Sequence, residues 1–232
     1  MSNIATTGLD AADREQSAVR AGGAALLVGA AGVVVTSLFY GLSPPEAAMP
    51  VAPLDLKAAI AGAQRGAATM YAAGLVGVPA DVVISAAGLL LGTVEQARGR
   101  GFASMGWFLI AVSTVLFAVV DALVGFVLPR TAAGGEQAFL VAKSLFDVLF
   151  LAGTATFGLG AVFAAAPHVA GTGSLPRLLA VAALIAALVA LLGGLTGLFG
   201  IGVNPHLLGL GIAGGSFLFA IIGAVLSATG RL

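Results

Sequence analysis

The sequence has no cysteine, little charge and no cluster of basic residues. The absence of cysteine excludes disulfide bonds, thiolate-bound iron–sulfur clusters and cysteine nucleophiles. Charged residues make up only 9% of the chain, against about 25% in an ordinary soluble domain, and the net formal charge is zero. Without a basic patch, nucleic-acid binding is not expected. Apolar residues instead make up 59% of the chain, so it cannot form a water-soluble globular domain.

Six long apolar stretches separate the polar clusters of the chain. Each has at least about 20 residues, the length that an α-helix needs to cross the hydrocarbon core of a bilayer. Strands of a membrane barrel would alternate apolar and polar residues, whereas these stretches are continuously apolar. The sequence therefore predicts an all-α, polytopic transmembrane bundle of six helices in contact with the lipid bilayer. The predicted spans are about 22–42, 70–94, 102–128, 138–165, 178–200 and 207–229.

The distribution of lysine and arginine between the connections predicts the orientation. Short cytoplasmic loops are enriched in these residues, and more of them lie on the cytoplasmic side if both termini are there. We therefore expect an N-in, C-in protein with a polar cytoplasmic segment at 1–20 and one transmembrane domain at 21–230. The mixed charge of the first segment is a poor match to a cleavable signal peptide. The residues expected inside are Arg14, Arg20, Arg98, Arg100, Arg177 and Arg231, and those expected outside are Lys57, Arg65 and Arg130.

The long connection after the first span begins with several prolines and is expected to be extended there. From Asp55 onward, apolar residues recur at helical spacing, which predicts a short amphipathic helix on the outer membrane surface. An ordinary loop into the second span is the alternative. The apolar residues of this segment are Leu56, Ala59, Ile60 and Ala63.

Glycine is abundant, with 34 residues, and several glycines recur at a four-residue spacing. In lipid, small residues at this spacing let helices approach closely. We expect these faces to pack within the chain, with a homo-oligomer or a partner membrane subunit as the alternative. The helix-packing candidates are Gly88 with Gly92, Gly193 with Gly197, and Gly211 with Gly215.

Only four ionisable residues lie within the predicted spans: Asp81, Asp121, Lys143 and Asp147. A charge at the centre of a membrane helix costs about 2.5–3.5 kcal/mol on insertion scales, so each requires a partner or a function. Lys143 and Asp147 are four residues apart and can form an ion pair on one helix face. If the second, third and fourth spans adjoin, the excess of carboxylates favours a bound cation, a shared proton or a cationic substrate. Pro79 is expected to kink the helix and free a carbonyl near this candidate polar site.

A purely structural interpretation of the same residues is the alternative. In it, Lys143 and Asp147 neutralise each other, and Asp121 is satisfied by a backbone group, a hydroxyl or Arg130.

Known catalytic and cofactor patterns are missing from the sequence. His168 and His206 lie on opposite sides of the predicted membrane, so they cannot ligate one haem. Two histidines without cysteine do not make a zinc hydrolase site. Ser216 follows two glycines, but neither a histidine nor an acid accompanies it. We therefore expect no cofactor, no metal and no catalytic residues.

Three short motifs, Phe157–Ala161, Leu175–Arg177 and Gly193–Gly200, occur near the fourth and fifth spans. With the long connection after the first span, they make the chain resemble a bacterial family of six-helix integral membrane proteins classed as a domain of unknown function, type 4386. The resemblance implies the six-helix fold and a location in the bacterial cytoplasmic (inner) membrane. It implies no particular chemistry.

The sequence supports two functional hypotheses. The first is a non-enzymatic membrane protein, either free-standing or an accessory subunit of a partner. The alternative is a proton- or cation-linked small-molecule transporter or binding protein that uses the intramembrane aspartate and lysine residues. The transporter predicts that the four ionisable side chains converge on a cavity, whereas the accessory subunit predicts isolated pairs and an exposed face of small residues.

Overall fold

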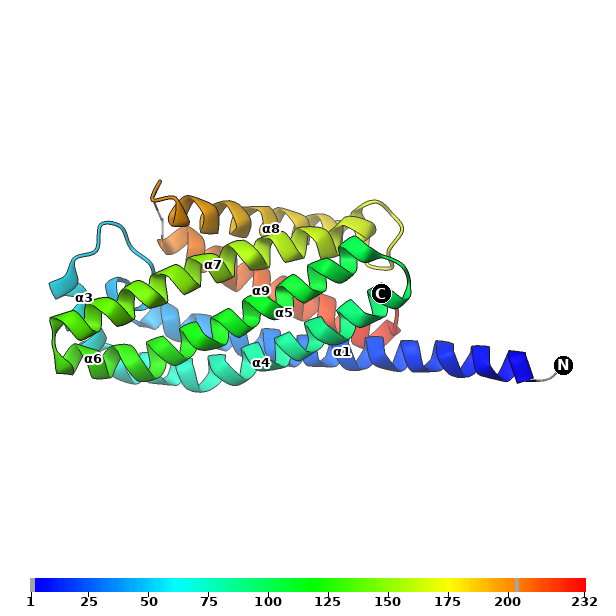
Figure 1. The fold of residues 1–232 in the computed structure, drawn as a ribbon, viewed down its shortest axis with the longest axis horizontal. Helices are drawn as coiled ribbons and strands as arrows, with labels where there is room; N and C mark the ends of the chain where they lie inside the picture. The colour runs from blue at the N-terminus through cyan, green and yellow to red at the C-terminus, as the bar shows by residue number, and fades with distance from the viewer. Residues whose placement is uncertain (1–2, 203–204) are drawn as a thin grey trace.

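The computed structural model describes the backbone of residues 3–202 and 205–232, and the side chains of residues 11–202, 208–209 and 211–232. Among these residues, six helical stretches are long and apolar enough to cross a membrane, as the sequence predicted, and the chain is a multi-pass membrane protein. They run side by side along the long axis of the molecule (Figure 1). The spans are α1 (Asn3–Leu42), α4 (Ala67–Ala97), α5 (Gly101–Ala122) with its continuation to Gly134, α7 (Glu136–Val169), α8 (Arg177–Leu198) and α9 (Pro205–Thr229).

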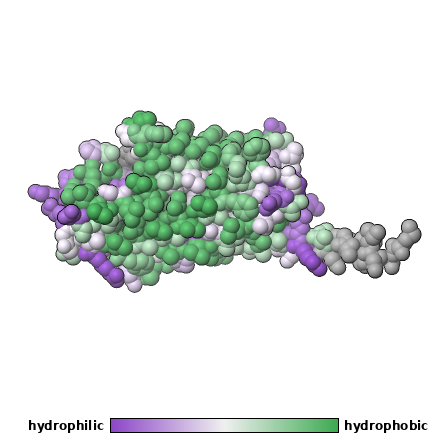
Figure 2. Space-filling view, viewed as in Figure 1, coloured by the Kyte–Doolittle hydropathy of each residue, from purple (hydrophilic) through white to green (hydrophobic). Residues whose placement is uncertain are grey.

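The spans form a closed ring in chain order. Each of α1, α4, α5, α7 and α8 packs against the next, and α9 returns to α1. Helices joined by short turns are therefore neighbours, as expected. Figure 2 shows a broad band of apolar residues across the visible face, with hydrophilic residues gathered at the two ends. This pattern matches the hydrocarbon core of a bilayer between its two polar surfaces.

Glycine brings neighbouring helices into backbone contact at every seam of the ring except one. A Cβ atom on Gly106 of α5 would lie 2.4 Å from the Ala164 nitrogen of α7, closer than real Cβ atoms approach. Because apolar burial does not drive helix association in lipid, such close packing is the main source of attraction between spans. The glycines with this role are Gly29 between α1 and α4, Gly74 and Gly88 between α4 and the third span, Gly106 and Gly160 between α5 and α7, Gly158 and Gly194 between α7 and α8, and Gly23 and Gly223 between α1 and α9.

The exception is the seam between α8 and α9. A Cβ on Gly193 or Gly211 would make only ordinary contacts, at 3.5 and 3.9 Å, and one on Gly215 would meet no atom within 4 Å. The structure therefore differs here from the close packing expected for these glycines, whereas Gly88 and Gly92 do lie against α5. Gly194, the next residue of α8, faces α7 instead, because one step along a helix rotates a residue by about 100°.

A π-helical turn interrupts the third span. α5 continues through η1 (Leu123–Val127) into α6 (Leu128–Gly134). Pro129 has no amide hydrogen to donate to the carbonyl four residues earlier, and we attribute the wider turn to this missing bond. The span therefore extends beyond its predicted end at residue 128. Asp121 lies two residues before the π turn, a kind of element that is frequent at functional sites.

The connection between α1 and α4 contains α2 (Pro45–Ala48) and α3 (Leu56–Arg65). The sequence predicted a helix in the second part of this segment, and α3 confirms it. Its first turn is stabilised by Asp55, whose side chain accepts a hydrogen bond from the Ala58 amide at 3.0 Å. We call the end of the bundle that carries these short helices the α3 end.

The apolar face of α3 lies against the protein. Ala59 and Ala63 are fully buried, within an apolar cluster shared with the spans. The side chain of Gln64 also donates a hydrogen bond to the Ala132 carbonyl of α6, at 2.9 Å. The helix therefore closes the end of the bundle, whereas the sequence placed its apolar face on the membrane surface.

The opposite end, which we call the Arg98 end, is held by two arginines from the turn between α4 and α5. Arg98 donates a hydrogen bond to Glu15 of α1 at 2.8 Å and another to the Leu232 carbonyl. Arg100 donates to the Thr172 carbonyl, between α7 and α8, at 2.8 Å. Four segments that are distant in sequence are thereby tied together.

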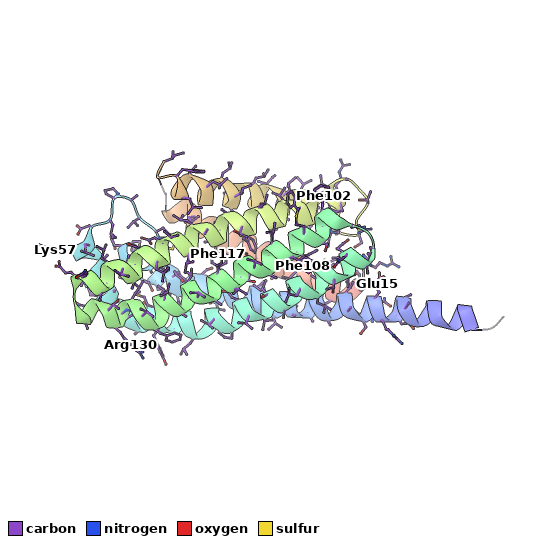
Figure 3. All side chains as sticks on the ribbon, in the orientation of Figure 1. Glu15, Lys57, Phe102, Phe108, Phe117 and Arg130 are labelled. Carbon is purple, nitrogen blue, oxygen red and sulfur yellow. The ribbon has the colours of Figure 1, made fainter. Side chains whose placement is uncertain are left out.

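Charged side chains flank the apolar band at both ends. Figure 3 places Glu15 toward the Arg98 end, and Lys57 and Arg130 at the α3 end. The polar segment expected at 1–20 is not separate from the first span, because α1 begins at Asn3 and continues without a break. In Figure 1 this helix extends well beyond the rest of the bundle.

Candidate functional site

A cavity of about 410 Å³ lies at the centre of the ring, and all six spans contribute to its wall. Members of both large apolar clusters border it, one cluster toward each end of the bundle. The space exists because α8 and α9 present small residues to it, so that no side chain fills the centre. Its volume lies within the range typical of small-molecule sites. These small residues are Ala183, Ala187, Ala190, Gly211 and Gly215.

Two carboxyl groups lie together on the cavity wall. Asp81 of α4 and Asp121 of α5 are both buried, with 3% and 6% of their surfaces exposed. The two side chains lie next to each other, because Asp121 packs onto Gly77, one helical turn from Asp81. The Tyr40 hydroxyl of α1 donates a 2.7 Å hydrogen bond to Asp121 Oδ1. Among the cavity-lining residues that the structure describes, none is lysine, arginine or histidine.

The local sequence explains how the two carboxyls come so close. Asp121 packs directly onto Gly77 of α4, one helical turn from Asp81 on the same helix. A Cβ on Gly77 would lie only 1.6 Å from Asp121 Oδ2. Any side chain at this position would therefore push the carboxyl away, and glycine allows the pairing.

Pro79 lies outside the site, contrary to the expectation from the sequence. α4 continues as a helix from Ala67 to Ala97 through this proline. The residue is exposed on the surface of the bundle and is not among the residues that line the cavity. Its position two residues before Asp81 turns it to a different face of the helix, because successive residues rotate by about 100°.

Lys143 and Asp147 form the ion pair that their spacing predicted, but the pair lies away from the cavity. Lys143 is fully buried, and its ammonium also donates a 2.8 Å hydrogen bond to the Met49 carbonyl, which follows α2. Neither member of the pair lines the cavity. The convergence of all four side chains, which the transporter hypothesis predicted, is therefore not found, and the separate Lys143–Asp147 pair is the one that the structural alternative predicted. Arg130, the other cation considered for Asp121, is exposed at the α3 end, and Tyr40 is the partner instead.

The serine and threonine hydroxyls that the spans contribute to the cavity wall present acceptors rather than donors. Each donates its hydrogen to a carbonyl of its own helix, as Thr154 does to Phe150 at 2.7 Å and Ser216 to Ile212 at 2.8 Å. The oxygen lone pairs remain free, since each hydroxyl has one hydrogen and two lone pairs. Together with the carboxyls, the wall suits a ligand that donates hydrogen bonds. The other hydroxyls of this kind are Thr36, Ser37 and Thr114.

Aromatic rings form much of the remaining wall. Phe157 and Phe219 contact each other with ring centroids 5.0 Å apart, and Phe117 contacts Phe150 at 5.9 Å. Figure 3 places Phe117 in the middle part of the bundle, away from both charged ends. Faces of aromatic rings attract cations as well as apolar groups. The wall therefore combines apolar surface with the two acidic side chains of Asp81 and Asp121.

Metal and hydrolase chemistry find no support in the described part of the chain. It contains no group of three or more histidine, cysteine, aspartate or glutamate residues placed to hold a metal ion. Ser216 donates to its own helix and has no histidine beside it among the cavity-lining residues. His206 lies outside the residues whose side chains are described.

Sequence reasoning missed Tyr40, the hydroxyl partner of the carboxyl pair. A signal was available, because the chain has only two tyrosines and one of them lies near the outer end of the first predicted span. A tyrosine there is also expected at a membrane interface, so the residue alone does not indicate a site. The small residues of α8 and α9 were also a signal for the cavity. The position of the cavity, however, depends on which helices face each other, and the sequence does not determine this.

Comparison of the chain with protein-family models, with curated proteins and with solved structures gives no match, and the resemblance to a domain of unknown function stays a prediction.

Proposed function

We propose that the protein binds a small organic cation with an apolar body in its central cavity, and that it serves as a carrier or binding protein in the bacterial cytoplasmic membrane. Both termini are cytoplasmic in this proposal. The observation that carries it is the pair of buried carboxyls on the wall of a cavity that no described cationic side chain lines. Asp81 and Asp121 supply the charge that recognises the ligand.

Electrostatics support a positively charged ligand. Two unit charges about 4 Å apart interact by about 4 kcal/mol at an effective dielectric constant of about 20. A carboxylate pair without a counter-charge is destabilised by a repulsion of this order and by the loss of hydration. A cation between the two groups converts the repulsion into attraction. Tyr40 donates only one hydrogen bond and brings no charge, so it cannot fill this role.

The shape and chemistry of the remaining wall support an apolar body with hydrogen-bond donors. The cavity has room for an aromatic molecule of drug-like size. Phe157 and Phe219 offer ring surface, and the hydroxyl of Ser216 offers lone pairs. An anion would meet repulsion from the carboxyls, and a purely apolar molecule would leave them without a partner.

The accessory-subunit hypothesis accounts for less of the structure. It predicts isolated ion pairs, which fits Lys143 with Asp147 but does not explain two adjacent carboxyls. It also predicts an exposed face of small residues for a partner helix. The small residues of α8 and α9 at Ala187 and Gly215 instead border the cavity.

Binding of ethidium, a fluorescent aromatic cation with amine donors, tests the proposal. The full chain in detergent micelles is titrated with ethidium and with phenanthridine, the related ring system that is uncharged at neutral pH. We expect ethidium to bind and phenanthridine to bind at least about tenfold more weakly, because only the cation pairs with the carboxyls. Equal affinity for the two compounds would contradict the proposal.

Single variants locate the binding site. Asp81→Asn and Asp121→Asn should each weaken ethidium binding by at least about tenfold, since each removes a buried charge partner. Glu95→Gln is the matched control, because it neutralises another buried carboxyl of α4 that pairs with Arg100 at the Arg98 end, far from the cavity. Its binding should be unchanged. Wild-type affinity in both aspartate variants would overturn the proposal.

A further inference from the structure

We infer that Asp81 and Asp121 exchange a proton for the bound cation, so that each cation entering the cavity releases one proton. The inference rests on the proposed cation site and deepens it, because it makes the site a proton–cation exchanger. It starts from the placement of the two carboxyls, since both line one cavity and Asp121 packs onto Gly77, one helical turn from Asp81.

A hydrogen bond between two carboxyl groups requires a proton on one of them. Two ionised carboxylates buried side by side would repel each other, because a carboxylate only accepts hydrogen bonds, whereas a proton on one of them removes the repulsion. The Tyr40 hydroxyl uses its one hydrogen on Asp121 Oδ1. Since no lysine, arginine or histidine is among the described residues that line the cavity, a proton on one carboxyl supplies the positive charge that stabilises the pair when no cation is bound.

The groups around the pair support this charge balance. Tyr40 from α1 is the titratable group that faces the carboxyls from outside α4 and α5. Among their described residues, α7, α8 and α9 contribute apolar, glycine, serine and threonine side chains to the wall, and none of these titrates near neutral pH. Lys143 and Asp147 of α7 pair with each other away from the cavity.

The exchange conserves charge within the apolar core. In the step, an organic cation enters, a carboxyl O–H bond breaks, and the proton leaves to water while the new carboxylate pairs with the cation. The net charge inside the cavity is the same before and after. The empty pair carries one proton and one negative charge, and after the exchange two carboxylates hold one cation. Cation and proton therefore compete, because a proton left on one carboxyl would remove one of the two negative charges that attract the cation.

The cavity reaches closer to one end of the bundle than to the other. Its wall extends to Pro45 and Met49, at the α3 end. Toward the other end, a buried apolar cluster that includes Trp107 and Leu226 separates the carboxyls from the surface.

Isothermal titration calorimetry with ethidium measures the proton directly. The positive charge of ethidium is fixed, so any proton released on binding comes from the protein. The full chain in detergent is titrated at pH 7 in two buffers, phosphate and Tris, which differ in their enthalpy of ionisation. We expect the binding enthalpy to differ between the buffers by the amount that corresponds to about one proton per ethidium, and the affinity to rise by up to about tenfold per pH unit over the range in which the pair is protonated. Glu95→Gln should release the same proton.

The outcomes separate this inference from the proposed function. Ethidium binding with the same enthalpy in both buffers, at each pH, would overturn proton exchange and leave cation binding in place. No ethidium binding to the wild-type chain would overturn the proposed function and the exchange with it. In Asp121→Asn, residual binding should release less than half of the wild-type proton count, because the remaining carboxyl has lost its paired neighbour. Unchanged release would also overturn the exchange.

Discussion

Replacing Gly77 with alanine tests the geometry that holds the two carboxyls together. The added Cβ would lie 1.6 Å from Asp121 Oδ2, whereas an ordinary contact begins at 3.4 Å. The Asp121 side chain must therefore retreat by about 1.8 Å, or α4 and α5 must separate. A retreat of this size breaks the 2.7 Å hydrogen bond from Tyr40.

Two opposing contributions set the size of the effect. Loss of a hydrogen bond to a charged group costs about 1.5–3 kcal/mol. Alanine in place of glycine inside a helix recovers up to about 1 kcal/mol. We therefore expect Gly77→Ala to lower the free energy of unfolding by about 0.5–2 kcal/mol. Ethidium affinity should fall as well, because the displaced Asp121 carboxyl no longer faces Asp81.

The assay is reversible unfolding in mixed detergent micelles, followed by circular dichroism, with an ethidium titration of the same samples. Gly214→Ala is the matched control, since its added Cβ meets no atom within 4 Å and the residue does not line the cavity. It should be as stable as the wild type or slightly more stable. If Gly77→Ala matches this control in stability and in binding, Asp121 does not lie against α4 and the carboxyl pair is wrong.

Four further variants test other parts of the structure. Asp147→Asn leaves the buried ammonium of Lys143 without a counter-charge and should lower the free energy of unfolding by about 3 kcal/mol, so an unchanged value would contradict the ion pair. Gly215→Leu fills part of the cavity and should weaken ethidium binding at least tenfold while the protein stays folded; normal binding would place the ligand elsewhere. Since the chain lacks cysteine, Lys57→Cys and Gln96→Cys can be labelled separately in intact cells, and a membrane-impermeant maleimide should modify only the first. Labelling of only the second would reverse the orientation.

The six spans were predictable because the signal for them is local. A helix that crosses a bilayer must be apolar over its whole length, and the polar clusters between spans mark the turns. The Lys143–Asp147 ion pair was predictable for the same reason, since a four-residue spacing places both side chains on one face of one helix. These features depend on no contact between distant parts of the chain.

The carboxyl pair and the cavity depend on contacts between helices, which spacing along the chain does not determine. Asp81 meets Asp121 because Gly77 admits the second carboxyl, and the sequence alone does not show which of 34 glycines has this role. The same limit applies to helix packing. Gly193 and Gly194 are adjacent in sequence, yet only Gly194 lies against α7, because one step along a helix rotates a residue by about 100°.

The location of a bound cation tests the central proposal most directly. The protein can be crystallised with an iodinated aromatic ammonium compound, whose iodine is located by its anomalous scattering. We expect the iodine beside Phe157 or Phe219 in the cavity, with the ammonium group within hydrogen-bonding distance of Asp81 or Asp121. Anomalous density only on the outer, lipid-facing surface of the bundle, with the cavity free of the compound, would contradict the proposal.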